Sequence, residues 1–201
     1  MKNNEEKRRA EYAVLKYRSF LRGIILDVGC RDRHAEKYLK GNFKYVGIDI
    51  SGKPDVIVDL ENQKIPFQDN YFDAVICLDV LEHLNNIQDV FDELLRVSKR
   101  YVVISLPNCY PSILFNVISG REKTKHYGLP IESKKDRHKW FFNYKEAKEF
   151  IMKKAEKNGA KVIDIHPFIK NRPLRNFIFK ILFRKNYENI AALCIFALIE
   201  K

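Results

Sequence analysis

The sequence predicts an α/β fold built on one mostly parallel sheet. Short apolar runs rich in Ile, Val and Leu recur between residues 23 and 107, and several of them end at an acidic residue or a glycine. Segments with helical spacing of apolar residues lie between these runs. Buried parallel strands have this composition, and strands that alternate with helices form right-handed βαβ units. The chain has 201 residues, 46% of them hydrophobic, and is long enough to bury a substantial core.

Each expected element has a local signal. Seven apolar runs predict strands, at residues 23–29, 44–50, 55–60, 72–79, 101–107, 161–169 and 189–199. Helices are expected where apolar residues recur with helical spacing, at residues 4–22, 34–40, 87–97 and 143–158. Asn143 is a good N-cap for the last of these helices, and Asn158-Gly159 forms its exit.

The pattern loosens after Pro107. Residues 120–139 are polar and basic without periodicity, which predicts a long loop over the carboxyl edge of the sheet. Residues 172–185 place apolar side chains among basic ones and predict a basic amphipathic helix. Such a helix lies on an anionic membrane surface, packs between the last two strands or forms a dimer contact.

The positive charge is concentrated in the last two-fifths of the chain. Residues 1–120 carry 17 Lys and Arg against 17 Asp and Glu, whereas residues 121–201 carry 20 against 9. The whole net charge of +11 therefore lies in the second part. This asymmetry indicates an anionic partner, such as nucleic acid, a phosphorylated small molecule or a lipid headgroup surface, or else a basic surface that contacts only water.

Two further features concern the compartment. The chain has no apolar N-terminal segment of the secretory type and no run of about 18 apolar residues that could span a membrane. Its four cysteines lie far apart, without a CxxC pair. We therefore expect a cytoplasmic protein with reduced thiols.

Acidic residues and a glycine close the first three predicted strands. Asp27 and Gly29 close the first, Asp49 the second, and Asp59 with Leu60 the third. Ligands bind α/β sheets at the carboxyl ends of strands, where a glycine permits close approach. Asp49 follows Asp27 by 22 residues, near the spacing of a ribose-binding carboxylate. Together these residues predict a pocket for an adenosine-like ligand.

Three blocks of sequence carry a resemblance to a known family. ILDVGC, YVGIDIS and, most specifically, IPFQDNYFDAVICLDVLEHL resemble the class I S-adenosylmethionine-dependent methyltransferases of the type 11 group. The resemblance implies a Rossmann-like seven-stranded sheet, mostly parallel with helices on both faces and an antiparallel last strand. It also implies one methyltransferase domain over residues 1–201, with a leading helix at 1–22, a cofactor-binding half at 22–108, and an acceptor-side half at 109–201 with a basic loop at 120–142.

The resemblance assigns S-adenosylmethionine as cofactor and its contacts to the strand ends. The implied cofactor-binding residues are Asp27, Gly29, Cys30, Asp49, Ile50, Asp59, Leu60, Leu78 and Asp79. Asp27 and Gly29 would lie near the methionine portion and Asp49 would hold the ribose. The third strand end would flank adenine, and the residues after the fourth strand would line the reacting methyl group.

The glycine-rich turn departs from the G-x-G-x-G pattern that is common in the family. It reads Gly29-Cys30-Arg31-Asp32-Arg33, with arginine at both later glycine positions. Three interpretations follow. Arg31 or Arg33 pairs with the cofactor's carboxylate or an anionic acceptor, both arginines point to solvent, or the turn is degenerate and no longer binds cofactor.

His83 is the candidate catalytic residue. A histidine just after the fourth strand would lie near the methyl group, and its pKa is close to working pH, so it can act as a base; the alternative is a structural histidine. Asp79, Glu82 and His83 also resemble a metal-assisting cluster in some quinone-biosynthesis O-methyltransferases, but the same carboxylates can simply cap the following helix. We predict no metal ligand.

The prediction for function is methyl transfer to a small-molecule, lipid-linked or glycan-like acceptor of anionic character. A basic lid with Lys134, Lys135, Arg137 and Lys139 would recruit it, unless Trp140 and its aromatic neighbours are simply an anchor in the core.

Two other function classes remain as alternatives. One is an RNA methyltransferase, which the net charge favours, although no NPPY-type tetrapeptide or RNA-binding appendage is present. Nucleic acid is therefore the less favoured partner, and peripheral membrane contact is an alternative. The other is a non-catalytic binding module. A nicotinamide oxidoreductase is disfavoured because G-x-G-x-x-G is absent.

Overall fold

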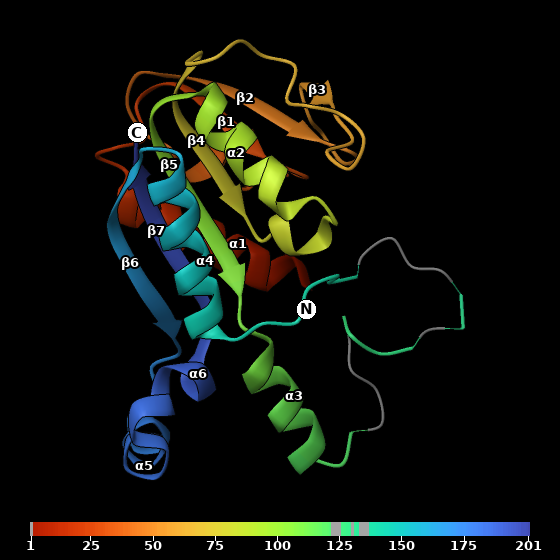
Figure 1. Ribbon diagram of the computed structural model, residues 1–201, viewed down its shortest axis with the longest axis vertical. Coiled ribbons are helices and arrows are strands. Elements are labelled where there is room, and N and C mark those ends of the chain that lie inside the picture. The colour runs from red at the N-terminus through yellow and green to blue at the C-terminus, as the bar shows by residue number, and fades with distance from the viewer. Residues whose placement is uncertain (1, 122–125, 130, 133–136) are drawn as a thin grey trace.

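One sheet organises the described part of the chain. The computed structural model describes residues 2–121, 126–129, 131–132 and 137–201. In these residues seven strands pair in the order β3-β2-β1-β4-β5-β7-β6 (Figure 1). The strands are β1 (Gly23–Val28), β2 (Phe43–Asp49), β3 (Val56–Ile57), β4 (Phe72–Leu78), β5 (Ser98–Pro107), β6 (Lys161–Ile169) and β7 (Ala192–Glu200). Only β7 runs antiparallel to its neighbours, so the predicted fold class is confirmed.

Helices cover both faces of the sheet, because strand residues alternate between two apolar cores. Ile25 and its equivalents pack against α1 (Lys2–Tyr17), whereas Leu26 and its equivalents pack against α2 (Ile87–Val97) and α4 (Tyr144–Lys157). Figure 1 shows α1 behind the sheet and the other two helices in front. A period-two apolar pattern buried on both sides gives the continuous apolar runs seen in the sequence.

Several predicted elements differ from the structure. Residues 34–40 form only a 3-10 turn at Glu36–Tyr38. The predicted strand at 55–60 is reduced to two residues, and the last strand starts later because α6 (Tyr187–Ala191) precedes it.

The helix α3 (Cys109–Ile118) was not predicted at all. It contains Pro111, which would break a helix interior but is tolerated in the first turn, where backbone N–H groups have no helical partner. Asn108 caps this turn by accepting a hydrogen bond from the backbone N–H of Tyr110.

The predicted amphipathic segment forms α5 (Pro173–Phe183), and none of its residues is buried. The interpretation of a helix packed between the last two strands is therefore wrong. Among the described residues, no helix has the length and apolar character needed to cross a membrane. The four cysteines form no disulfide within the described residues, and all four are buried.

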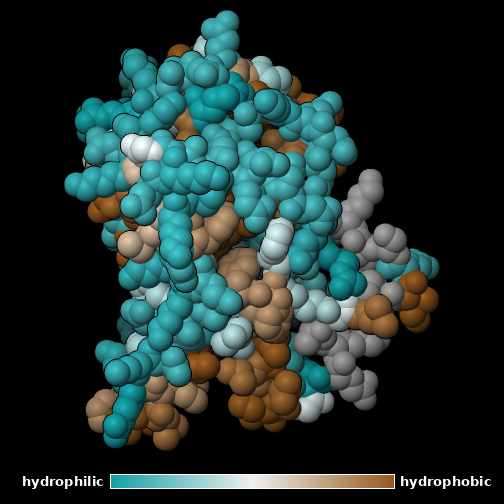
Figure 2. All heavy atoms as spheres, in the orientation of Figure 1, coloured by the Kyte–Doolittle hydropathy of each residue, from teal (hydrophilic) through white to brown (hydrophobic). Residues whose placement is uncertain are grey.

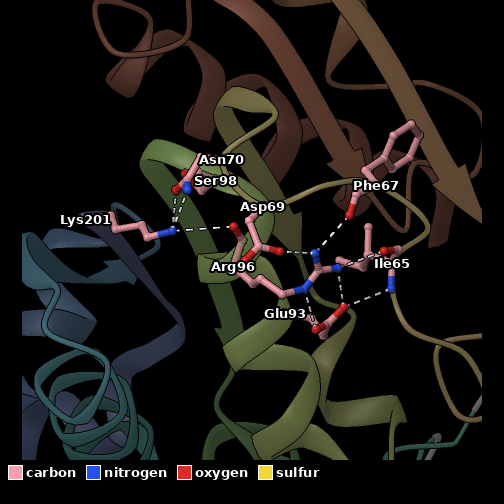
Figure 3. A network of polar contacts seen from close by, with 8 residues as sticks. All are labelled: Ile65, Phe67, Asp69, Asn70, Glu93, Arg96, Ser98 and Lys201. Atoms are coloured by element: carbon pink, nitrogen blue, oxygen red, sulfur yellow. Dashed lines mark hydrogen bonds and ion pairs between the residues drawn. The ribbon is translucent and has the colours of Figure 1, made fainter.

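The first part of the most specific sequence block, residues 65–69, forms a structural network with α2 (Figure 3). The guanidinium of Arg96 in α2 donates to the backbone oxygens of Ile65 and Phe67, each at 2.9 Å. It also pairs with Asp69 and Glu93, both at 2.7 Å. The PF-x-D segment is thus held against α2, which orients the chain as it enters β4.

Candidate active site

The turn after β1 keeps a glycine-type backbone although two of its residues are arginines. Gly29 has a φ of +75°, and a Cβ there would lie 2.2 Å from Cγ2 of Val80. Arg31 and Arg33 have φ values of 45° and 58°. This left-handed conformation costs a residue with a side chain about 1–2 kcal/mol. The turn therefore retains the backbone path of glycines at the expense of local strain.

Arg33 compensates for this strain with side-chain contacts. Its guanidinium lies 2.7 Å from Glu36 and 2.7 Å from Asp55, and 4.5 Å from the centre of the Tyr45 ring. The interpretation that both arginines point to solvent is therefore wrong for Arg33, which ties the turn to β2 and to the loop before β3. Arg31, in contrast, is an exposed residue.

Asp49 at the end of β2 is oriented by backbone N–H groups. Its Oδ2 accepts from Arg31 N and its Oδ1 accepts from Ser51 N, both at 2.9 Å. Lys53 N donates to Arg31 O at 2.7 Å, so the loops after β1 and β2 brace each other. A carboxylate has about four acceptor positions, so these two bonds leave capacity for a pair of ligand hydroxyls. Its neighbour Ile50 is exposed.

Asp27 and Cys30 form the inner wall of the same strand end. Asp27 is buried and accepts a hydrogen bond of 2.5 Å from the Tyr45 hydroxyl. Burial raises the pKa of Asp27 to about 7. The Cys30 thiol is also buried, which raises its pKa to about 12, so it is a packing group rather than a nucleophile.

The two residues predicted to flank adenine after β3, Asp59 and Leu60, stabilise the protein's own structure. The carboxylate of Asp59 accepts from Glu61 N and from the Asn62 side chain, and so caps a tight turn. Leu60 is buried in the core on the α2 face. The Asp59 carboxylate thus already has two donors within its own turn.

The end of β4 brings together residues from distant parts of the chain. Asp79, with φ of +54°, accepts from the Ser105 hydroxyl at 2.9 Å and forms an ion pair with Arg9 of α1. Pairing with Asp79 raises the pKa of Arg9. Leu78 is half-buried at the same strand end. Arg9 was not among the predicted site residues, because nothing local distinguishes it from the other basic residues of the first helix.

Side chains on β6 hold α1 in this position. The Tyr17 hydroxyl donates to Asp164 at 2.9 Å, and the Tyr12 hydroxyl lies 2.9 Å from Nε2 of His166. Lys16 adds an ion pair with Asp164 at 3.2 Å. These contacts fix the helix that carries Arg9 across the sheet.

A second cluster follows directly, in the 3-10 turn Leu81–His83. Glu82 is 1% exposed, and its Oε1 lies 3.8 Å from Nε2 of His83 and 3.9 Å from Nε2 of His138. Burial raises the pKa of Glu82 well above its ordinary value. Ligand atoms of these three residues all lie within 4.8 Å of one another. Within the described part of the chain, the buried Oε2 of Glu82 has no hydrogen-bond partner.

The two histidine rings are oriented from their far sides. Nδ1 of His83 lies 3.0 Å from the backbone oxygen of Arg137, and Nδ1 of His138 lies 2.9 Å from the Tyr127 hydroxyl. A carbonyl oxygen can only accept, so Nδ1 of His83 carries the proton, and Nε2 of the neutral ring is the basic nitrogen turned towards Glu82. The cluster therefore has the composition of a cation site or of a proton-accepting site.

The segment that brings His138 to this cluster lies along the turn after β4. Lys139 N donates to Glu82 O at 2.8 Å, and its ammonium pairs with Glu61. The indole N–H of Trp140 donates to Leu84 O at 2.6 Å. Of the predicted basic lid, Lys134 and Lys135 lie outside the described residues.

Gly29, Asp49 and Asp79 lie along the carboxyl edge of the sheet, and their ligand contacts stay a prediction. Tertiary contacts bring Arg9 and His138 to the same edge. His138 follows His83 by 55 residues. Only a tertiary contact could have revealed its place. The strand order, the carboxyl-edge carboxylates and the turn after β1 define the class of protein as a class I methyltransferase fold.

The comparisons with known proteins agree with this class. Residues 4–164 match the family model described as a methyltransferase domain, and the chain belongs to that family. No curated protein matches the sequence. The predictions of a class I methyltransferase, of an enzyme, and of S-adenosylmethionine as methyl donor are confirmed.

Solved structures share the fold at low sequence identity. An S-adenosylmethionine-dependent methyltransferase from Archaeoglobus fulgidus is 16% identical, with a TM-score of 0.62 over 97% of this chain and 94% of that chain. Magnesium protoporphyrin IX methyltransferase from Synechocystis, with bound S-adenosylhomocysteine, is 15% identical, with a TM-score of 0.61 over 98% and 83%. The small RNA methyltransferase HEN1 is 14% identical, with a TM-score of 0.68 over 98% of this chain but 25% of that chain.

Proposed function

We propose that this methyltransferase acts on a hydroxyl group of a small-molecule, lipid-linked or glycan-like acceptor, placed at the cluster of Glu82, His83 and His138. The observation that carries the proposal is the position of this cluster directly after β4. Val80, the residue before this 3-10 turn, lies against Gly29 in the turn after β1. A donor site and a group able to manage a hydroxyl proton thus share one edge of the sheet.

The donor site is proposed to lie between the turn after β1 and the end of β4. Asp49 would accept the two ribose hydroxyls, with Ile50 and Asp59 bordering the base. On the methionine side, Arg9 and Asp79 offer a cation and an anion, which complement the carboxylate and ammonium groups of an amino acid. The oriented Asp49 carboxylate and the glycine-type turn both fit this ligand, so the interpretation of a degenerate turn is not adopted.

His83 is proposed to take the acceptor's proton. When bound, S-adenosylmethionine supplies a methyl group on a sulfonium; the carbon–sulfur bond breaks as the acceptor oxygen bonds to that carbon. The hydroxyl proton must leave in the same reaction. Because the Arg137 carbonyl keeps the ring proton on Nδ1, Nε2 of His83 is the nitrogen that can receive it.

A second candidate role for the cluster is to hold a divalent cation, which differs from the prediction that the protein has no metal ligand. One carboxylate and two imidazoles form a donor set that suits Mn²⁺ or Zn²⁺. A buried Glu82 oxygen without a partner in the described residues fits such an ion, which would offset the carboxylate's charge and lower the pKa of an acceptor hydroxyl.

Binding experiments separate these roles without knowledge of the acceptor. We expect S-adenosylhomocysteine to bind the purified protein in calorimetry, and no binding would contradict the donor site. Mn²⁺ titrated into chelator-treated protein should bind, and His138→Ala should weaken binding at least tenfold. His166→Asn, which changes a histidine on β6, serves as the control. If the wild type takes up no Mn²⁺, the cation role is wrong and the role of His83 as a base stands alone.

A further inference from the structure

The helix α5 turns its apolar side chains away from the rest of the protein. Leu174, Phe177, Ile178, Ile181 and Leu182 recur at helical spacing and are between 44% and 73% exposed. In a helix that packs on its own protein this stripe faces the core. In α5 it faces outwards.

The second half of α3 also exposes apolar side chains. Phe115, Val117 and Ile118 are 57%, 72% and 82% exposed. In Figure 1 both helices project from the sheet at the end where β4 and β5 terminate. Figure 2 shows hydrophobic surface gathered at this same end, over α3 and α5. We call this surface the α3/α5 end.

Positive charge surrounds the apolar stripe. Residues 170–186 contain six Lys and Arg and no Asp or Glu. Two of these, Arg175 and Lys180, lie within α5 itself, and Arg184 and Lys185 follow it directly. Beside α3, the guanidinium of Arg121 lies 5.0 Å from the centre of the Phe115 ring. An apolar face with a basic border is the composition that binds an anionic bilayer surface.

We propose that the α3/α5 end docks on an anionic lipid bilayer, with the apolar side chains in the interface and the basic ones at the headgroups. A second copy of the chain is a poorer occupant, because it would bring two strongly basic surfaces together. A nucleic acid would pair with the basic residues but would leave the apolar stripe exposed to water.

Docking in this way would place the methyl-transfer site beside the membrane. The helix α3 begins at Cys109, directly after β5, and the Cys109 thiol donates to the backbone oxygen of Phe142. Phe142 ends the segment that brings His138 to Glu82. The acceptor class that fits is a lipid-linked molecule whose reacting head group is presented from the bilayer surface; this step rests on the proposed function, whereas the docking itself does not.

Vesicle sedimentation tests the docking without donor or acceptor. Wild-type protein should bind vesicles of phosphatidylcholine with phosphatidylglycerol, bind pure phosphatidylcholine vesicles weakly, and release from the anionic vesicles as salt rises. The triple variant Phe177→Ser, Ile181→Ser, Leu182→Ser should lose at least tenfold in vesicle affinity. Met152→Ser, which changes an exposed apolar residue on α4, is the matched control and should bind like wild type.

The other outcomes contradict the proposal. Docking is wrong if the wild-type protein does not bind anionic vesicles, or if the triple variant binds them equally well. A wild-type dimer that the triple variant converts to a monomer would assign the surface to a second copy of the chain. Preferential binding of a single-stranded RNA that depends on the lysines but not on the apolar residues would assign it to nucleic acid. S-adenosylhomocysteine affinity, measured on the same samples, should be unchanged in the triple variant. A failure of docking is thereby distinguished from a failure of the donor site.

Discussion

The predicted cofactor-binding half of the chain, residues 22–108, and the predicted acceptor-side half, residues 109–201, differ in the side chains that they leave exposed. We call them the donor half and the acceptor half. In the donor half, key charged groups are engaged in specific contacts, as Arg33 is with Glu36 and Asp55 and as Arg96 is with Glu93. In the acceptor half, β6 and β7 complete the sheet, but α5 leaves its apolar stripe exposed. The difference fits our proposals, in which polar contacts of the donor half shape a ligand site and exposed groups of the acceptor half bind a partner.

The largest expected effect is a change in the free energy of unfolding, and it concerns Asp27, a polar residue buried in the donor half. Burial raises the pKa of Asp27 from 3.8 to about 7. Ionisation of the Asp27 carboxyl is unfavourable in the folded protein. Asp27 therefore does not destabilise the fold below pH 3.8, and its destabilising effect grows as the pH rises from 3.8 towards 7. Asp27→Asn keeps an acceptor for Tyr45 and should stabilise the protein at pH 8 by at most about 4 kcal/mol, with little effect at pH 4.

Urea unfolding of the Asp27→Asn variant at the two pH values measures this effect. The control is Asp89→Asn, which removes the same charge from an exposed position. A gain that is equal at both pH values would show that Asp27 is not an unfavourably ionised group.

The next effect concerns the ligand site itself. Asp49→Ala removes a carboxylate that two backbone N–H groups orient, so affinity for S-adenosylhomocysteine should fall by about 1.5–3 kcal/mol, while the fold is retained. Calorimetry on this variant and on Asp89→Ala provides the comparison. An unchanged dissociation constant in the folded Asp49→Ala protein would remove Asp49 from the ribose site.

A smaller effect on the free energy of unfolding should distinguish Arg31 from Arg33 in the turn after β1. Arg31→Gly relieves a left-handed φ of 45° and should raise the free energy of unfolding by about 0.5–1 kcal/mol. Arg33→Gly relieves a similar strain but loses the contacts to Glu36 and Asp55, so no net gain is expected. If affinity for S-adenosylhomocysteine falls on Arg31→Gly, Arg31 contacts the donor's carboxylate. A rise would mean that Arg31 crowds the pocket.

The smallest effect on stability belongs to the acceptor half. Ile181→Ser replaces an apolar side chain that is already exposed, so the free energy of unfolding should change by no more than about 0.5 kcal/mol. Thermal unfolding at low protein concentration measures it. A loss of 2 kcal/mol or more would mean that α5 is part of the core, and the contrast between the halves would disappear.

Local patterns predicted several elements well. The helix at 87–97 has the predicted bounds, because one apolar face and a polar start define it within eleven residues. Asn143 caps the helix that follows it, with Glu146 completing a capping box. The carboxylates at the ends of β1 and β2 were foreseeable because parallel strands bring their carboxyl ends to one edge.

The tertiary structure decided which of these residues meet. Arg9 reaches Asp79 across 70 residues, and His138 joins His83 across 55, contacts that leave no periodic signal in the sequence. The sequence did not predict that the apolar stripe of α5 faces outwards either. Helical spacing shows that a helix has an apolar face, but what covers that face depends on how distant segments pack, and here the described part of the chain leaves it exposed.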